Sequence, residues 1–199
     1  MSRDFRFTNY ISFEYVMARV EGLLVENRII IWNQDQSHRL FGNGYYGKPL
    51  GISKPKGVQF DSPLILDLME GCYLSEIGKL VILNKFRRQL SYGDIRAICK
   101  KEYANFERDY VVFKYLREKG YIVSPGLKFG CDFAIYEKGP GIDHAPYLIQ
   151  VFERNEDLTA TGIVLFGRLA TTVKKQFILA LPALERENVD FIGFEWWKA

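Results

Sequence analysis

The second half of the chain alternates helical and strand-like patterns, and this order constrains the fold more than any other feature of the sequence. Residues 108–119 carry apolar side chains at i, i+4 spacing with charges between them, and Gly120 follows where such a helix would end. Strand-like runs occupy 121–123, 133–136 and 147–152, a helical pattern covers 159–175, and further strand-like runs occupy 177–181 and 191–197. The order α-β-β-β-α-β-β predicts an α/β module with a mixed sheet.

The first half of the chain has a less regular pattern. β-Branched and aromatic residues in 18–32 indicate strand, the polar run 34–39 indicates a solvated loop, and 41–50 is rich in turn residues. Asp61-Ser62-Pro63 indicates the start of a helix, because Asp or Ser can cap it and Pro suits its first position. Gly78 is expected to end that helix.

A short strand over 80–83 and a second helix complete this half. Ser91 and Asp94 have the spacing of a capping box at the start of that helix. We therefore expect a fold of the α/β (α+β) class. It has a small mixed domain over residues 1–104, followed by an α/β domain with a mixed central sheet over residues 105–199.

The three cysteines exclude two classes of small stabilised domain. Cys72, Cys99 and Cys131 are odd in number and far apart, which argues against a disulfide framework and against a zinc site. The N-terminus has no signal-peptide core, and no run approaches the ~18 apolar residues that span a bilayer. We expect a cytoplasmic protein with no membrane segment, no metal site and no cofactor.

The charge of the chain is compatible with an RNA partner without requiring one. The formal net charge is only +3, but residues 79–128 hold twelve Lys and Arg against five Asp and Glu. Phosphate contacts are sought in such a basic region. A pair of solvated helices with lysines on their outer faces has the same composition.

Only two residues, His38 and His144, could serve as a histidine acid or base. His38 lies in the polar run, whereas His144 lies in a loop rich in Gly and Pro directly before an apolar strand, where a rigid sheet can present a catalytic side chain. Tyr136 ends the preceding strand, and Lys174 and Lys175 precede the next one. Adjacent strand ends could bring these side chains to one edge of the sheet.

A tyrosine, a histidine and a lysine together suit cleavage of RNA by its own 2′-hydroxyl. Two acid–base steps remove the proton from that hydroxyl and protonate the departing 5′-oxygen. A lysine ammonium stabilises the charged phosphorane, and no metal is required.

Several stretches of the chain resemble the tRNA-splicing endonucleases, especially those of archaea. In family order they are Tyr110 to Tyr121 (YVVFKYLREKGY), Gly126 to Tyr136 (GLKFGCDFAIY), His144 to Ile149 (HAPYLI) and Gly167 to Phe177 (GRLATTVKKQF). Residues 63–98 also resemble the N-terminal region of the family. The resemblance implies a nuclease-like C-terminal domain that carries the catalytic site.

The resemblance also implies roles for individual residues. Tyr136 matches the general base for the 2′-hydroxyl, and His144 matches the general acid for the 5′-oxygen. Lys175 matches the catalytic lysine if Val173-Lys174-Lys175 aligns with the family element, with Lys174 as the alternative.

Three further residues match RNA-binding positions. Arg168 matches an arginine that grips a bulged nucleotide. Trp196 or Trp197 lies where the family places a residue beside that arginine.

The family cuts two three-nucleotide bulges separated by a short helix, which implies precursor tRNA as substrate and two active sites at a fixed separation. The resemblance implies a tetramer, either of identical subunits or with a related structural subunit. An acidic loop of one subunit would enter a basic pocket of another, and residues 182–190, with Glu185, Glu187 and Asp190, lie where that loop is expected. A solvated hairpin turn would carry similar charges.

Two other functions are compatible with the sequence. Asp132 and Glu153 on neighbouring strands could bind Mg²⁺ for a metal-dependent nuclease. The chain could also be a non-catalytic RNA-binding subunit of the same assembly, although such a subunit has no need of Tyr, His and Lys together.

Overall fold

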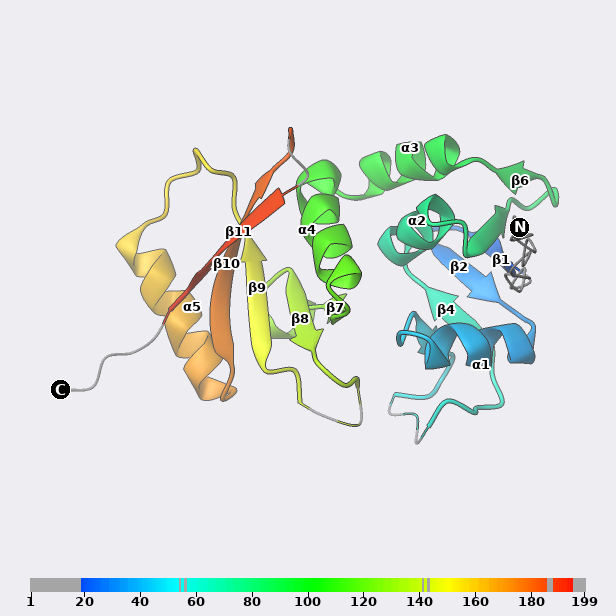
Figure 1. The fold of residues 1–199 in the computed structure, drawn as a ribbon, viewed down its shortest axis with the longest axis horizontal. Helices are drawn as coiled ribbons and strands as arrows, with labels where there is room; N and C mark the ends of the chain where they lie inside the picture. The colour runs from blue at the N-terminus through cyan, green and yellow to red at the C-terminus, as the bar shows by residue number, and fades with distance from the viewer. Residues whose placement is uncertain are drawn as a thin grey trace, which may run out of the picture.

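The structure, a computed structural model, describes residues 19–53, 55, 57–140, 142, 144–185 and 188–194. Two lobes lie side by side, each built on its own β-sheet (Figure 1). The N-terminal lobe comprises the elements up to residue 102, and the C-terminal lobe begins with the helix at residue 106. In the described part of the chain, no helix has the length and apolar character needed to cross a membrane.

The N-terminal lobe is a mixed sheet with three helices. Its elements are β1 (Val20–Val25), β2 (Arg28–Ile31), α1 (Gln34–Gly42), β3 (Lys48–Pro49), β4 (Leu64–Leu66), α2 (Leu68–Glu76), β5 (Leu80–Leu83), β6 (Gln89–Leu90) and α3 (Tyr92–Glu102). The strand order is β3-β4-β2-β1-β5-β6. Only the β1–β5 pair among these neighbours is parallel.

The strand conformation expected in 18–32 is confirmed as two strands, β1 and β2, with a turn at Glu26, whose φ is 52°. Two other local expectations for this lobe were wrong. The loop expected over 34–39 belongs to helix α1, which the Asn33 side chain caps by accepting the N–H of Gln36. The helix expected to start at Asp61-Ser62-Pro63 begins five residues later, at Leu68.

The displaced helix start has a tertiary cause. Residues 64–66 pair with both β2 and β3 as strand β4, so sheet pairing overrides the helical spacing of their apolar side chains. Asp67 then starts α2 through a reciprocal capping box with Glu70. The expected end at Gly78, the strand over 80–83 and the capping box of Ser91 with Asp94 are confirmed.

The C-terminal lobe confirms the predicted order of elements and the mixed sheet. It contains α4 (Phe106–Glu118), β7 (Ile122–Pro125), the 3₁₀ turn η1 (Leu127–Phe129), β8 (Phe133–Tyr136), β9 (Tyr147–Val151), α5 (Ala160–Thr172), β10 (Gln176–Ala183) and β11 (Asn188–Gly193). The strand order is β11-β10-β9-β8-β7. Strands β9 and β10 are parallel and α5 connects them, whereas the other pairs are antiparallel.

Helices α4 and α5 cover opposite faces of this sheet. Phe133, Ile135 and Ile149 share a core with α4, whereas the alternate residues Ala134 and Leu148 lie in a second core with Phe166 of α5. Residues 182–190, expected to be an acidic loop, are mostly strand, because Ala183 pairs with Asn188 across a short turn. Glu187 lies outside the described residues.

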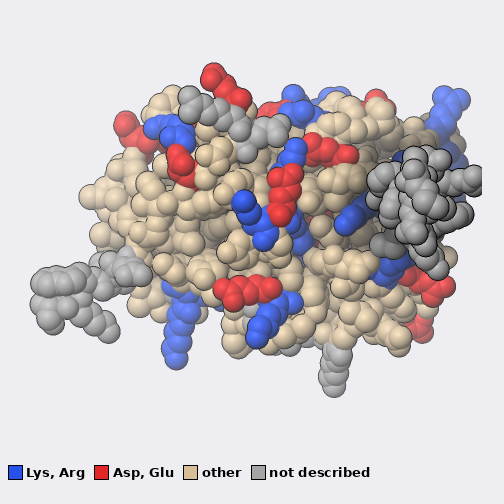
Figure 2. All heavy atoms as spheres, in the orientation of Figure 1, with Lys and Arg blue, Asp and Glu red and all other residues tan. Residues whose placement is uncertain are grey.

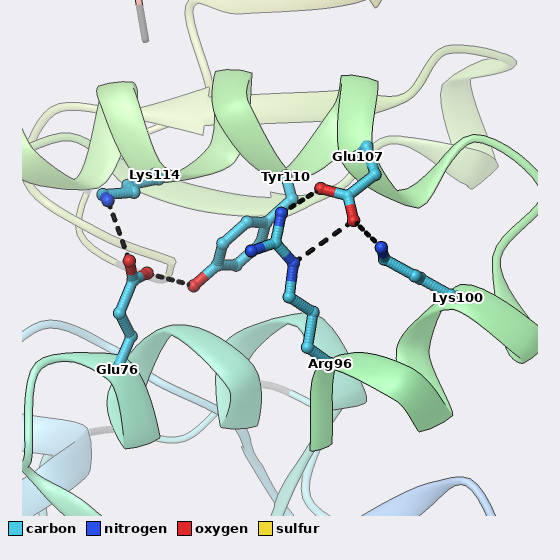
Figure 3. A network of polar contacts seen from close by, with 6 residues as sticks. All are labelled: Glu76, Arg96, Lys100, Glu107, Tyr110 and Lys114. Atoms are coloured by element: carbon cyan, nitrogen blue, oxygen red, sulfur yellow. Dashed lines mark hydrogen bonds and ion pairs between the residues drawn. The ribbon is translucent and has the colours of Figure 1, made fainter. Parts of the chain in front are cut away.

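One face of α4 joins the two lobes through a polar network that is visible in Figure 3. Glu76 of α2 accepts hydrogen bonds from the Tyr110 hydroxyl at 2.5 Å and from Lys114 Nζ at 2.9 Å. Glu107 pairs with Arg96 and with Lys100, both on α3. The two pairs of Glu107 are partly exposed, so each contributes at most about 1 kcal/mol to stability.

Farther along the same face, Arg117 is buried between the lobes. Its guanidinium donates to the carbonyl oxygen of Gly44 at 2.7 Å and to that of Val123 at 3.3 Å, and it lies 4.2 Å from the centroid of the Tyr46 ring. Glu70 Oε1 is 3.6 Å from its Nη2. Because α4 also packs on the C-terminal sheet, this junction fixes the two lobes against each other.

Candidate active site at one edge of the C-terminal sheet

Three strand ends meet at one edge of the C-terminal sheet. Tyr136 is the last residue of β8, and β9 begins at Tyr147 after the turn that carries His144. Because β8 and β9 are antiparallel, with Ile135 opposite Tyr147, the end of one lies beside the start of the other. Strand β10 runs parallel to β9 with Gln176 opposite Tyr147, so Lys175 precedes β10 at the same edge.

A hydrogen bond ties Lys175 to the turn that carries His144. The Lys175 ammonium donates to the carbonyl oxygen of Ala145, the residue after His144. Its Nζ also lies 5.2 Å from the centroid of the Phe129 ring. Lys174 differs from it, since it is exposed and occupies a turn position with φ of 53°. The geometry therefore directs Lys175, rather than Lys174, to the sheet edge.

The other two residues differ in exposure. Tyr136 is half-buried and packs on a cluster that includes Cys131, Leu148 and Phe177. His144 is exposed, whereas the neighbouring Ala145 is 2% exposed and anchors the turn in the same cluster. The edge thus combines a packed tyrosine with a histidine that solvent or a substrate can reach.

Acidic and phenolic groups stand beside this edge. The Tyr147 hydroxyl donates to Glu137 at 3.3 Å, and the negative charge of that carboxylate raises the pKa of Tyr147. Both side chains are accessible at the point where β8 ends and β9 begins. They belong to the surface that a substrate at His144 would meet, and no sequence pattern singled them out.

Arg168 projects from α5, the helix that leads to Lys175. Thr159 caps the start of α5 by accepting the N–H of Gly162, and Arg168 lies one turn before its end. The Arg168 side chain is exposed. Trp196 and Trp197, the other two residues expected to bind RNA, lie outside the described residues.

His38 has a different environment from His144. Its Nε2 accepts the N–H of Phe60 at 3.1 Å, and its ring meets the Phe60 ring edge-on at 4.8 Å between centroids. These contacts join α1 to the segment before β4. Of the two histidines, His38 is thus committed to holding the N-terminal lobe together.

The acids considered for a metal site already have protein partners or lie in the open. Asp132 accepts the N–H of Val151 at 2.7 Å and an N–H of the Gln150 amide at 2.6 Å, and burial raises its pKa. Glu153 is exposed. Among the residues that the structure describes, no group of three or more His, Cys, Asp and Glu side chains could hold a metal ion.

Part of the positive charge in the basic stretch 79–128 is paired within the protein. Arg96, Lys100 and Lys114 pair with acids at the junction of the lobes. On the face that Figure 2 shows, blue and red side chains are interspersed rather than gathered by sign. Much of the local excess of charge is therefore structural.

Comparison with known proteins identifies both lobes. Residues 20–96 match the family described as tRNA intron endonuclease, N-terminal domain, and residues 106–191 match tRNA intron endonuclease, catalytic C-terminal domain. The chain is 40% identical over 179 residues to a tRNA-splicing endonuclease of Hyperthermus butylicus. The aligned region covers 90% of this chain and 99% of that protein.

Two further relatives have the same relationship to this chain. A tRNA-splicing endonuclease of Sulfurisphaera tokodaii is 41% identical over 178 residues, covering 89% of this chain and 98% of that protein. One of Saccharolobus solfataricus is 39% identical over 180 residues, covering 90% and 99%. These matches span both lobes, and the chain therefore belongs to the tRNA intron endonuclease family.

Proposed function

We propose that this protein is a tRNA-splicing endonuclease that cuts introns from precursor tRNA at bulge-helix-bulge sites. The supporting observation is that the strand ends that carry Tyr136, His144 and Lys175 lie at one sheet edge, in the part of the chain that matches the catalytic domain of the family. The three side chains supply a proton acceptor, a proton donor and a fixed positive charge. Cleavage by the RNA's own 2′-hydroxyl needs these three functions and no metal.

Each residue has one step in the proposed reaction. Tyr136 accepts the proton of the 2′-hydroxyl, whose oxygen attacks the adjacent phosphorus. His144 donates a proton to the 5′-oxygen as its bond to phosphorus breaks, and the Lys175 ammonium stabilises the extra negative charge of the phosphorane. The products are a 2′,3′-cyclic phosphate and a 5′-hydroxyl.

RNA binding is assigned to α5 and the C-terminal end. Arg168 is exposed on the helix that leads to Lys175, so a guanidinium there could hold a bulged nucleotide near the scissile bond. Trp196 or Trp197 would support the same nucleotide by stacking. These roles rest on the family resemblance of the positions.

The proposed assembly follows from the substrate. Two cuts at a fixed separation need two active sites, and the chain has one candidate set, so we propose a homotetramer or a heterotetramer with a related subunit. The hairpin within 182–190, with exposed Glu185, would contribute to its interfaces. We further propose that residues 1–104 and 105–199 are separate domains and that the enzyme acts in the cytoplasm.

The test is cleavage of an intron-containing precursor tRNA in excess EDTA, with analysis of the new ends. Cuts at both bulges that leave 2′,3′-cyclic phosphate and 5′-hydroxyl are expected. Activity that appears only with Mg²⁺ would favour hydrolysis at Asp132 and Glu153 instead. Absence of cleavage in both conditions, even with a related subunit added, would favour a non-catalytic role in RNA binding.

A further inference from the structure

We propose that Phe129 is a positioning residue for cleavage, because its ring holds the Lys175 ammonium at the sheet edge. The inference rests on the proposed function and adds a residue to which neither the sequence patterns nor the matched families assign a role. It starts from one contact, the 5.2 Å between Lys175 Nζ and the centroid of the Phe129 ring.

Phe129 is held rigidly where it meets Lys175. It ends η1, where its N–H donates to the carbonyl oxygen of Gly126 at 2.7 Å. The turn closes at Gly130, whose φ of 67° favours glycine. Gly126 in turn donates to Asp132, next to β8, at 2.8 Å. The ring is half-buried against the cluster that contains Tyr136, Ala145 and Phe177, so the turn cannot move independently of the sheet edge.

The ring and the Ala145 carbonyl fix the ammonium from two elements. The face of an aromatic ring is electron-rich and attracts a cation within about 6 Å of its centroid. The carbonyl of Ala145 accepts a hydrogen bond from the same nitrogen. Neither of these two contacts carries a formal charge, so neither neutralises the ammonium as a carboxylate would. Both contacts hold the ammonium in position at the sheet edge.

A second cation lies over the same ring. Lys128 Nζ is 4.8 Å from the Phe129 centroid, and this lysine is exposed. Two ammonium groups therefore lie over one ring, at the edge where the backbone of the RNA would pass. Substitution of the ring should shift the Lys175 ammonium but leave its positive charge in the protein. The rate of the chemical step should therefore fall more than the affinity for RNA.

The test compares three variants by single-turnover cleavage at saturating and at subsaturating enzyme. Phe129→Leu keeps an apolar side chain without an aromatic face, and Phe129→Tyr restores the face. Phe86→Leu is the matched control, because Lys85 lies 5.1 Å over the exposed Phe86 ring in the N-terminal lobe, remote from the sheet edge. Thermal unfolding of each variant establishes the temperature at which all are folded.

We expect Phe129→Leu to lower the saturating rate constant about 10- to 100-fold with little change in the half-saturating enzyme concentration. Phe129→Tyr should restore most of the rate, and Phe86→Leu should cleave like the wild type. An unchanged rate for Phe129→Leu, or an equal loss for Phe129→Leu and Phe129→Tyr, would overturn the inference while wild-type cleavage leaves the proposed function standing. Failure of the wild type to cleave, even with a related subunit added, would instead refute both.

Discussion

The junction between the lobes and the candidate catalytic edge use the same kinds of side chain in opposite ways. At the junction, Tyr110 and Lys114 bind Glu76, and Arg117 is buried between two backbone carbonyls and Glu70. At the edge, His144 is exposed and Lys175 is held by a backbone carbonyl and a ring face.

This difference indicates what each region is for. Charged groups that pair with one another across the two lobes fix the relative position of the lobes. Their charges are neutralised by their partners. A side chain presented on an exposed loop, as His144 is, remains accessible to an incoming substrate. The substitutions below test that division, from the largest expected effect to the smallest.

A substitution at the sheet edge should lower the cleavage rate and leave the stability of the fold unchanged. His144→Ala should lower the rate of precursor cleavage by about 10²–10⁴-fold, because the leaving 5′-oxygen loses its proton donor. RNA binding, measured as the dissociation constant of the precursor, should change little, and so should the melting temperature, because the side chain is exposed.

The matched control is the other histidine. His38→Ala removes an acceptor that binds the Phe60 N–H and a ring that packs on Phe60. It should destabilise the fold by about 1–3 kcal/mol and leave the cleavage rate of the folded protein unchanged. A His144→Ala enzyme that cleaves at the wild-type rate would contradict the assignment of the edge.

A substitution at the junction of the lobes should lower the free energy of unfolding and leave the cleavage rate of the folded protein unchanged. At pH 8, above the pKa of Glu70, Arg117→Met removes a buried cation and leaves the Glu70 carboxylate without its compensating charge, which should cost about 3–5 kcal/mol in the free energy of unfolding. Chemical denaturation measures this loss. The single-turnover rate of the folded fraction should stay near that of the wild type.

Lys100, in the polar network at the junction of the lobes, serves as the control. Lys100 pairs with Glu107 at 2.6 Å but is 54% exposed, so Lys100→Met should cost at most about 1 kcal/mol. A cleavage defect in Arg117→Met as deep as that in His144→Ala, with stability retained, would show that the two regions are not separable.

Sequence patterns predicted the C-terminal lobe better than the N-terminal lobe, for a physical reason. The order from α4 to β11 was confirmed because each element carries its own apolar pattern and end signals, such as Gly120. In the N-terminal lobe, Leu64-Ile65-Leu66 has helical spacing with the residues that follow, yet it pairs as β4 between two strands. Such pairing joins segments that are distant in the sequence, such as Ile29 and Leu66, and a local pattern does not encode it.

The candidate site shows the same limit. Strand ends alone predicted that Tyr136 and His144 could share one edge, whereas the choice of Lys175 over Lys174 came from the family resemblance. The structure brings the three strand ends together. Phe129 was inside a recognised stretch but had no predicted role, because its contact with Lys175 joins residues from two separate elements. A cation over a ring leaves no periodic signal in the sequence.

The smallest expected effect concerns pH and the buried acid at the junction. Burial and, next, the nearby Asp67 raise the pKa of Glu70 to about 7, although the charge of Arg117 opposes the rise. A carboxyl group whose pKa is higher in the folded state binds more protons there than in the unfolded chain. Its contribution therefore favours folding fully below its unfolded pKa of about 4.3 and is lost as the pH rises through about 7.

Glu70→Gln keeps an acceptor for the N–H of Gly47 but removes this titration. Between pH 5 and pH 8, the free energy of unfolding should therefore fall less in the variant than in the wild type, by roughly 1–3 kcal/mol. Asp109, whose pKa burial raises to about 6, titrates in both proteins, so its contribution cancels in the comparison. Equal slopes in the two proteins would mean that Glu70 stays ionised beside Arg117, and the junction would then be a buried ion pair throughout this pH range.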